Sequence, residues 1–283
     1  MFKKCVENVR NNVPLVHNIT NYVTVNDVAN VLLACGGSPI MSDDIDDVVD
    51  ITSICGGLNI NIGTLNKNTI PSMFAAGKKA NELGHVVLLD PVGAGASALR
   101  TNTANELMEK VKFDVVRGNI SEVKTLMVGS GSTKGVDADV ADKVTDENLE
   151  ETITKLKAFS KATGSIIAVT GAIDLVCNSE KCYVIRNGKP QMSSITGTDC
   201  QLSGLMTAYL VANSDNKLEA AAAAVCLMGL AGEIAYDRMQ DGSISGSGWD
   251  LYPINQNRVV EMAVDFIHFA QNIPPGTKSG RLF

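Results

Sequence analysis

Two side chains suited to group transfer, Asp199 and Cys200, follow Gly197 in a short turn that leads into a predicted helix over residues 200–212. The first N–H groups of a helix have no intrahelical partner and carry a partial positive charge, so they can hold a phosphate group or a developing oxyanion. An aspartate at such a position is also a common helix cap. The turn therefore indicates either a catalytic site built on Gly197, Asp199 and Cys200 or an ordinary capped helix.

A second candidate is Asp90, which ends a predicted strand and precedes a loop over residues 91–97 that contains Gly93 and Gly95. The backbone of a glycine-containing loop can approach a phosphate group closely, because no side chain stands in the way. An ordinary strand-to-helix connection has similar glycines, so that alternative stays open. The chain contains no Walker-type loop, which argues against a P-loop enzyme.

Arg117, Asn119 and Glu122 follow the next predicted strand. The guanidinium of Arg117 is suited to a nucleotide phosphate, because its N–H groups form a planar fork. Asn119 and Glu122 have the spacing of a capping box, in which the two residues bond to each other's backbone N–H groups. The same pair suits a site where Glu122 orders the water around Mg²⁺, since magnesium is held largely through water and one or two carboxylates. Both interpretations remain open for these two residues.

Two further segments carry weaker signals. Thr170 ends a predicted strand and precedes Gly171, which places a hydroxyl group beside a close backbone approach. Asparagine and threonine crowd the stretch from His17 through Asn21, and Met41 ends another predicted strand. A thioether suits a heteroaromatic ligand, although filling a gap in the core is the commoner role of methionine.

Short apolar runs alternate with amphipathic stretches, which predicts a mainly parallel sheet with helices on both faces. The predicted strands cover residues 38–41, 58–62, 86–90, 114–116 and 165–170, followed by an antiparallel edge over 174–177 and 182–186. The predicted helices cover residues 22–35, 69–83, 98–111, 147–163, 200–212, 218–239 and 258–271. A turn of type I′ is predicted at Asn187-Gly188. In such open sheets ligands bind beyond the carboxyl ends of the strands, where most of the candidate residues lie.

The composition predicts one globular domain over residues 1–283 in the cytoplasm. The chain has a net charge of −7 and no cluster of basic residues, which argues against a nucleic-acid partner. The most apolar stretch, residues 220–232, is too short to span a bilayer, so we expect no membrane span and no signal peptide. Seven scattered cysteines suit a reducing compartment. A zinc site at Cys177 and Cys182 is a minor alternative, because nothing supplies two more ligands.

Taken together, these segments resemble the hydroxyethylthiazole kinase family, whose members have a ribokinase-like three-layer αβα fold. The resemblance covers nearly the whole chain and rests on the motifs HNITNYV, NDVANVLLACGGSPIM, DPVGAGAS, RGNISEV, VTG and ITGTDC, in the family's order. It implies transfer of a phosphoryl group from ATP, with Mg²⁺, to the hydroxyl group of hydroxyethylthiazole in thiamine salvage. It also implies a homotrimer with active sites between subunits.

The resemblance assigns roles residue by residue. Met41, Asn21 and Gly197 are expected to contact the thiazole substrate. ATP is expected to be bound by a set of strand-end residues, namely Arg117, Thr170, Asn119 and Asp90. Glu122 and Asp90 are expected to serve Mg²⁺ through water. Cys200, Asp199 and Gly197 form the catalytic turn.

This chain departs from the family at Asp199, where the usual turn has glycine. Asp199 is expected either to accept the proton of the substrate hydroxyl group, to cap the helix, or to repel the γ-phosphate and weaken activity. The rival functions are phosphorylation of hydroxymethylpyrimidine or another small alcohol, a nucleotide-dependent dehydratase, and a catalytically impaired thiazole-binding protein.

Overall fold

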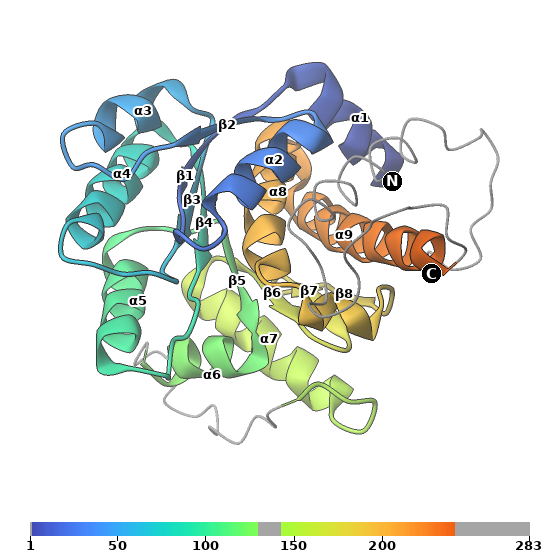
Figure 1. Cartoon of the computed structure of the whole chain (residues 1–283). Coiled ribbons are helices and arrows are strands. Elements are labelled where there is room, and N and C mark those ends of the chain that lie inside the picture. The colour runs from blue at the N-terminus through green and yellow to red at the C-terminus, as the bar shows by residue number, and fades with distance from the viewer. Residues whose placement is uncertain (1, 130–142, 241–283) are drawn as a thin grey trace.

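The computed structural model describes residues 2–129 and 143–240, which form a central sheet with helices packed on both faces (Figure 1). The strand order is β2-β1-β3-β4-β5-β6-β7-β8. The first six strands are parallel, and β7 and β8 are antiparallel at one edge. The predicted three-layer α/β fold with an antiparallel edge is confirmed. The predicted helix over residues 258–271 lies outside the described residues.

The strands are β1 (Leu15–Ile19), β2 (Ser38–Met41), β3 (Gly57–Asn61), β4 (Val86–Asp90), β5 (Val115–Asn119), β6 (Ile166–Thr170), β7 (Asp174–Cys177) and β8 (Cys182–Ile185). Every residue of the central strands β3 and β4 is buried, because helices cover both faces. This explains the continuous apolar run of residues 86–89 in β4. Strand β5 extends three residues beyond the predicted end, so Arg117 lies inside the sheet rather than at its edge.

One helical layer consists of α1 (Phe2–Asn12), α2 (Val25–Cys35), α8 (Thr198–Ala212) and α9 (Lys217–Gln240). The other consists of α3 (Val48–Ile54), α4 (Thr69–Leu83), α5 (Ala98–Lys110), α6 (Ile120–Gly129) and α7 (Leu149–Thr163). Each layer has its own apolar core against one face of the sheet. Helix α8 is buried along almost its whole length, because it lies between the sheet and the neighbouring helices α2 and α9 (Figure 1).

The sequence did not predict four elements: α1, β1, α3 and α6. Strand β1 was hidden by His17 and Asn18, polar residues that are nevertheless fully or almost fully buried. The two ring nitrogens of His17 lie 2.9 Å from Thr52 Oγ1 and 2.9 Å from the Ser42 carbonyl oxygen. Contacts to segments distant in sequence therefore stabilise a strand that local composition does not favour.

The β7–β8 hairpin and the turn that follows it each differ from their predictions. Cys177 and Cys182 form a disulfide across the hairpin, so they are not a zinc pair, and the other five cysteines are buried free thiols. Beyond β8, only Gly188 of the pair Asn187-Gly188 has a positive φ, so the predicted type I′ turn is wrong. The side chain of Asn187 instead donates a hydrogen bond to the Cys226 carbonyl oxygen on α9 at 2.6 Å.

Helix α9 is longer than its apolar centre suggested. By length and hydropathy, Ser214–Arg238 is the one segment among the described residues that is long and apolar enough to cross a bilayer. Inside the protein, 72% of its most apolar window is buried against the rest of the fold. This is the behaviour of a core helix.

The packing of α8 on β3 leads to a first prediction. A Cβ atom added at Gly57 would lie 2.5 Å from Val211 Cγ2 and 3.0 Å from Thr207 Cγ2 on α8. We expect Gly57→Ala to lower the free energy of unfolding in urea by about 1–3 kcal/mol, the usual range for overpacking a core. Gly171→Ala is the matched control, since no described atom lies within 4 Å of the added carbon and its φ is not positive. Equal stability of the two variants would contradict this account.

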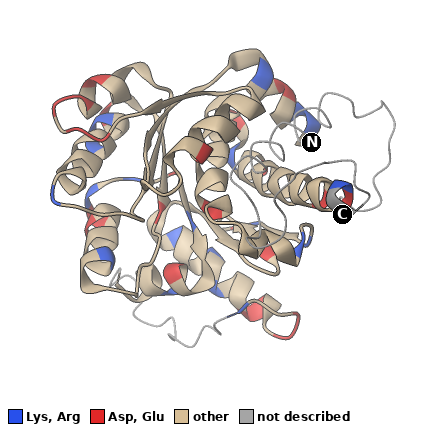
Figure 2. Ribbon diagram, in the orientation of Figure 1, with Lys and Arg blue, Asp and Glu red and all other residues tan. Residues whose placement is uncertain are grey.

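Charged residues are distributed over the helices and loops, while the strands are mostly uncharged (Figure 2). Asp90 and Arg117 are exceptions, since they lie in neighbouring central strands and are 0% and 1% exposed. Burying two charges is unfavourable unless they are paired and hydrogen bonded. This pair therefore indicates where the fold supports a functional site.

Candidate active site

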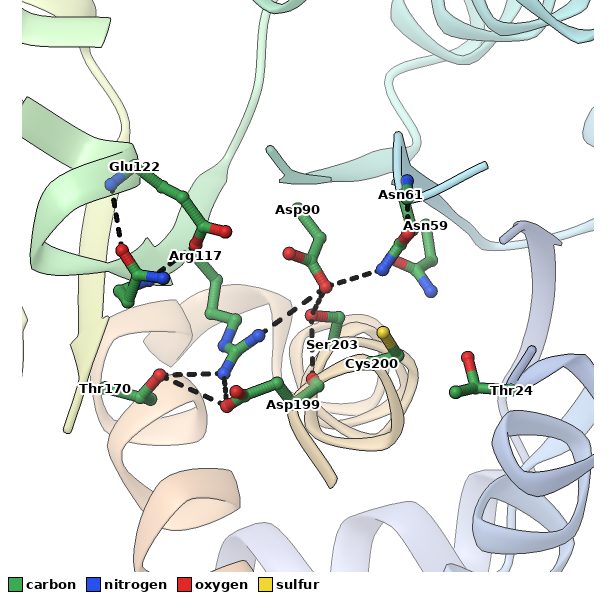
Figure 3. A network of polar contacts seen from close by, with 12 residues as sticks. Thr24, Asn59, Asn61, Asp90, Arg117, Glu122, Thr170, Asp199, Cys200 and Ser203 are labelled. Carbon is green, nitrogen blue, oxygen red and sulfur yellow. Dashed lines mark hydrogen bonds and ion pairs between the residues drawn. The ribbon is translucent and has the colours of Figure 1, made fainter. Parts of the chain in front are cut away.

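The candidate site lies where the carboxyl ends of β4, β5 and β6 meet the first turn of α8 (Figure 3). Asp90 ends β4, Arg117 is in β5, Thr170 ends β6, and Asp199 is in the first turn of α8. Neighbouring parallel strands end at the same edge of the sheet, which brings these residues together. Four of the residues predicted from separate motifs thus form one cluster.

Arg117 is the centre of this cluster. Its Nη1 lies 3.5 Å from Asp90 Oδ2, and its Nη2 donates hydrogen bonds to Thr170 Oγ1 at 2.7 Å and to Asp199 Oδ1. Burial lowers the pKa of the guanidinium, and the carboxylates of Asp199, Asp90 and Glu122 raise it to a net value well above normal. Arg117 is therefore a permanent cation within the central strand β5.

Asp90 has one occupied and one unoccupied carboxylate oxygen. Oδ2 accepts hydrogen bonds from Asn61 Nδ2 at 2.8 Å and from Ser203 Oγ at 2.7 Å. Oδ1 is buried and has no hydrogen-bond partner among the described residues. Burial raises the pKa of Asp90 to about 7, although Arg117 and the Ser203 hydroxyl group oppose the shift. A buried acceptor without a partner fits a hydrated cation, which would supply the missing donor.

Glu122 and Asn119 form a capping box, one of the two arrangements predicted for them from the sequence. Glu122 N donates to Asn119 Oδ1 at 2.9 Å, and Asn119 N donates to Glu122 Oε2 at 2.8 Å. Glu122 Oε1 also accepts a hydrogen bond from Gly93 N at 2.8 Å, which ties the loop after β4 to the first turn of α6. The described residues contain no group of three or more His, Cys, Asp or Glu side chains that could hold a metal ion directly. Two carboxylates, Asp90 and Glu122, fit Mg²⁺ that keeps most of its water.

Cys200 lies on the other side of α8 from Asp199 (Figure 3). Its Sγ accepts a hydrogen bond from Asn21 Nδ2 at 3.0 Å, and Asn21 Nδ2 also donates to Asn61 Oδ1 at 3.2 Å. Burial, with a smaller contribution from Asp90, raises the pKa of the Cys200 thiol. Cys200 is consequently a neutral thiol at neutral pH, which makes it a poor proton acceptor.

Gly197 is required by the local backbone. It has φ +90°, and an added Cβ atom would lie 3.1 Å from Thr24 Cβ and closer still to Thr24 Cγ2. Glycine adopts this left-handed conformation without a steric penalty. Its position beside Thr24, just before α2, brings the turn over residues 197–200 close to the N-terminal motif that contains Asn21.

Asp199 does not cap α8. Gly197 is the N-cap, and no side-chain capping hydrogen bond occurs there among the described residues, so the capping alternative is wrong. The Asp199 carboxylate pairs with Arg117 and lies 3.4 Å from Thr170 Oγ1. The positive charge of Arg117 is the main cause of its lowered pKa. The carboxylate is therefore anionic at neutral pH and is a weak base.

Met41 is not part of the Arg117 cluster in this chain. It ends β2 at the edge of the sheet, and β1 and β3 separate it from β4. The side chain is partly buried and packs against the core under α8. The structure thus divides the predicted site residues into a strand-end cluster and a separate edge position.

Three polar residues at the site were not predicted from the sequence. Asn61 and Ser203 donate to Asp90, and Asn59 donates to Asn18 on β1 (Figure 3). Asn59 and Asn61 alternate with apolar residues in a strand that was predicted to be buried. An amide in a fully buried strand needs a polar partner, and this was the signal available in the sequence. Ser203 had no comparable signal, because serine is common within helices.

The fold and the cluster define an α/β phosphotransferase-type protein with a ribokinase-like fold. Residues 6–248 of this chain match the model of the hydroxyethylthiazole kinase family. A hydroxyethylthiazole kinase from Clostridium acetobutylicum is 63% identical over 247 residues, covering 87% of this chain and 90% of that protein. This chain belongs to the hydroxyethylthiazole kinase family, as its motifs predicted.

Solved structures agree with this assignment. A hydroxyethylthiazole kinase protein from Pyrococcus horikoshii OT3 has a TM-score of 0.78 at 30% identity, covering 94% of this chain and 92% of the other. A ribokinase-like superfamily protein from Enterococcus faecalis V583 has a TM-score of 0.61 at 11% identity, covering 95% and 94% of the two chains. The second similarity concerns the fold alone.

Proposed function

We propose that this protein transfers the γ-phosphoryl group of ATP to the hydroxyl group of hydroxyethylthiazole, giving the thiazole phosphate used in thiamine synthesis. The observation that carries the proposal is the buried Asp90–Arg117 pair beside the first turn of α8. Phosphoryl transfer depends mainly on positioning and on stabilising negative charge. A fixed guanidinium and free helix N–H groups supply both.

The residues of the cluster have distinct proposed roles. Arg117 and Thr170 hold phosphate oxygens, and Asn119 supports the loop that lies beside them. Gly197 lets the turn approach the transferred group and the substrate. The N–H groups of the first turn of α8 stabilise the charge that develops on that group.

Asp90 and Glu122 are the proposed residues for Mg²⁺. The ion supplies positive charge that neutralises the phosphate oxygens during transfer. Asp90 Oδ1 is the acceptor available for a water molecule in the hydration shell of the ion. Glu122 holds the loop through Gly93 and adds a second negative charge nearby.

The protonation states support a mechanism without a strong general base. Cys200 carries a raised pKa and Asp199 a lowered one, so neither accepts a proton readily at neutral pH. We propose that Cys200 lines the catalytic turn as a neutral thiol and that the substrate hydroxyl group loses its proton late, to an oxygen of the transferred phosphoryl group. Asn21 positions the thiol through its hydrogen bond.

This proposal predicts that Cys200→Ala retains kcat within about tenfold of the native value, whereas losing a general base typically costs about 10²–10⁴-fold. The measurement is steady-state turnover of hydroxyethylthiazole between pH 6 and pH 9. Cys226→Ala, which removes a buried free thiol from α9, is the control. A loss of a hundredfold or more, specific to Cys200, would show that the thiol is the base.

Met41 lies at the edge of the sheet, apart from the Arg117 cluster. We propose a homotrimer in which the sheet edge with β2 lies near a neighbouring subunit and Met41 contacts the thiazole ring. The edge position of β2 and the exposed side chains of Tyr22 and Val23, 60% and 59% exposed, support this arrangement. Sedimentation at a range of protein concentrations measures the oligomeric state directly.

We further propose that residues 1–283 form one domain and that the protein acts in the cytoplasm on a small molecule. The continuous sheet through the described residues supports a single unit. The proposed use of ATP supports the cytoplasm, because ATP is supplied there. The Cys177–Cys182 disulfide runs against it, because disulfides are uncommon in reducing compartments.

Coupled ADP release with ATP and Mg²⁺ tests the function. Hydroxyethylthiazole is compared with hydroxymethylpyrimidine and with a reaction that lacks any alcohol. Release that depends on the thiazole supports the proposal. Release only with another alcohol keeps the reaction and changes the substrate, whereas thiazole binding without release indicates an impaired binding protein.

A further inference from the structure

Arg117 has no open face for a phosphate group. The residue is 1% exposed, and its two terminal nitrogens face Asp90, Thr170 and Asp199. Asp90 is 0% exposed and is held in place by Asn61 and Ser203. A phosphate group that binds the guanidinium must therefore displace Asp199.

Asp199 is able to leave. Its side chain is 69% exposed, in contrast to 2% and 1% for the side chains of Arg117 and Asp90. Both of its contacts in the cluster, to Arg117 and to Thr170, use the same oxygen, Oδ1 (Figure 3). It does not cap α8, so rotation of the side chain breaks no helix contact.

The carboxylate of Asp199 also resembles, as a hydrogen-bond acceptor, the phosphate group that would displace it. Carboxylate and phosphate oxygens both accept short, charge-assisted hydrogen bonds from a guanidinium. In this structure Asp199 Oδ1 accepts one such bond from Arg117 and lies near the Thr170 hydroxyl group. These are the two donors that we assign to the nucleotide phosphate.

We propose that Asp199 is an internal competitor for phosphate: its carboxylate occupies the Arg117 and Thr170 donors in the nucleotide-free protein and rotates outward when a phosphate group binds. Asp199 thereby sets the affinity for the phosphate donor without taking part in the transfer. The identity of the ligand as ATP rests on the proposed function, whereas competition with inorganic anions does not.

The test is calorimetric titration of inorganic pyrophosphate, without Mg²⁺, into the native protein and into Asp199→Ala and Asp199→Asn. We expect binding about tenfold tighter in Asp199→Ala, because the lost bond joins two charged groups. Asp199→Asn is expected to lie between the two, since a neutral amide competes less well. Circular dichroism and thermal melting establish that every variant is folded.

Asp174→Asn is the matched control. Asp174 lies close enough to Arg117 for the two charges to interact, but its Oδ1 accepts a hydrogen bond from Gly171 N at 2.8 Å. This variant removes the same charge from the same end of the sheet and leaves Asp199 on Arg117, so its affinity is expected to stay close to native. An equal gain in Asp174→Asn and Asp199→Ala would reduce the effect to general charge repulsion and overturn the proposal.

Unchanged or weaker pyrophosphate binding in Asp199→Ala would also overturn it, because Asp199 would then hold Arg117 in position. The absence of binding to all of the proteins would have the same consequence. Failure of the proposed function gives a different pattern. Suppose that the native protein releases no ADP with hydroxyethylthiazole, but that Asp199→Ala binds pyrophosphate more tightly than the native protein. The proposal for Asp199 would then stand, and the proposed kinase activity would be contradicted.

Discussion

Arg117→Lys is expected to lower kcat for hydroxyethylthiazole by about 10²–10³-fold, the usual loss when one preorganised donor to developing charge is removed. Lysine keeps the positive charge but not the planar fork. One ammonium group cannot reproduce the arrangement in which Nη1 faces Asp90 while Nη2 bonds to Thr170. The measurement is steady-state turnover with saturating ATP and Mg²⁺, together with a thermal melt.

Arg117→Lys is preferred to Arg117→Ala as the test of activity. Removing one partner of a buried ion pair typically costs about 3–5 kcal/mol, so the alanine variant combines a loss of activity with a loss of stability. Arg186→Lys is the control, because Arg186 is half exposed and pairs with Asp146, which is not part of the cluster. Turnover within about threefold of native in a folded Arg117→Lys would remove Arg117 from the transfer step, given the loss cited above.

Asp90→Asn is expected to increase stability and abolish activity. The pKa of Asp90 is about 7 in the folded protein, against an ordinary value of 3.8. As the pH rises between these values, the unfolded chain releases this proton and the folded protein keeps it. The contribution of Asp90 to stability therefore falls between about pH 4 and pH 7, and then stays constant. Asparagine retains an acceptor for Asn61 and Ser203 without the cost of ionisation.

We expect Asp90→Asn to raise the free energy of unfolding at pH 8 by about 2 kcal/mol, since each pKa unit corresponds to about 1.4 kcal/mol and the variant also loses the counter-ion of Arg117. The difference from the native protein should shrink toward pH 5. Turnover should fall by about 10²–10³-fold, because the carboxylate proposed for Mg²⁺ is gone. The measurements are urea unfolding without Mg²⁺ at both pH values and steady-state turnover.

Asp114→Asn is the matched control for stability. Asp114 accepts a hydrogen bond from Val87 N at 2.9 Å, and it pairs with Lys217 at 2.6 Å. Losing the charge there removes a favourable contact, so the expected sign is opposite. A destabilised Asp90→Asn at pH 8 would mean that Arg117 stabilises the ionised carboxylate more than burial disfavours it.

Several site residues were predictable because their positions follow from local pattern. Asp90 and Thr170 end apolar strands of a parallel sheet, and parallel strands deliver their ends to one edge. Gly197 comes shortly before the helix that was predicted over residues 200–212, and it is the N-cap of α8. Asn119 and Glu122 had a recognisable capping spacing, and the structure contains that capping box.

Other features depended on contacts between segments distant in sequence. Strand β1 contains polar residues that do not predict a buried strand. His17 is accommodated there because Thr52 and Ser42 supply hydrogen-bond partners. Ser203 lies 113 residues from Asp90 in the chain, yet it donates to that carboxylate. No local pattern predicts such a pair, since each residue alone has an ordinary local role.

The sequence by itself determined the family and the layered α/β fold, and it supplied most of the candidate site residues, because periodicity and motif spacing are local properties of the chain. The tertiary structure decided which of these residues meet and in what state of charge. It buried Arg117, raised the pKa of Asp90 and placed Asp199 on the guanidinium. Burial and charge pairing depend on neighbours that only the folded chain brings together, so the role proposed for Asp199 rests on the tertiary structure.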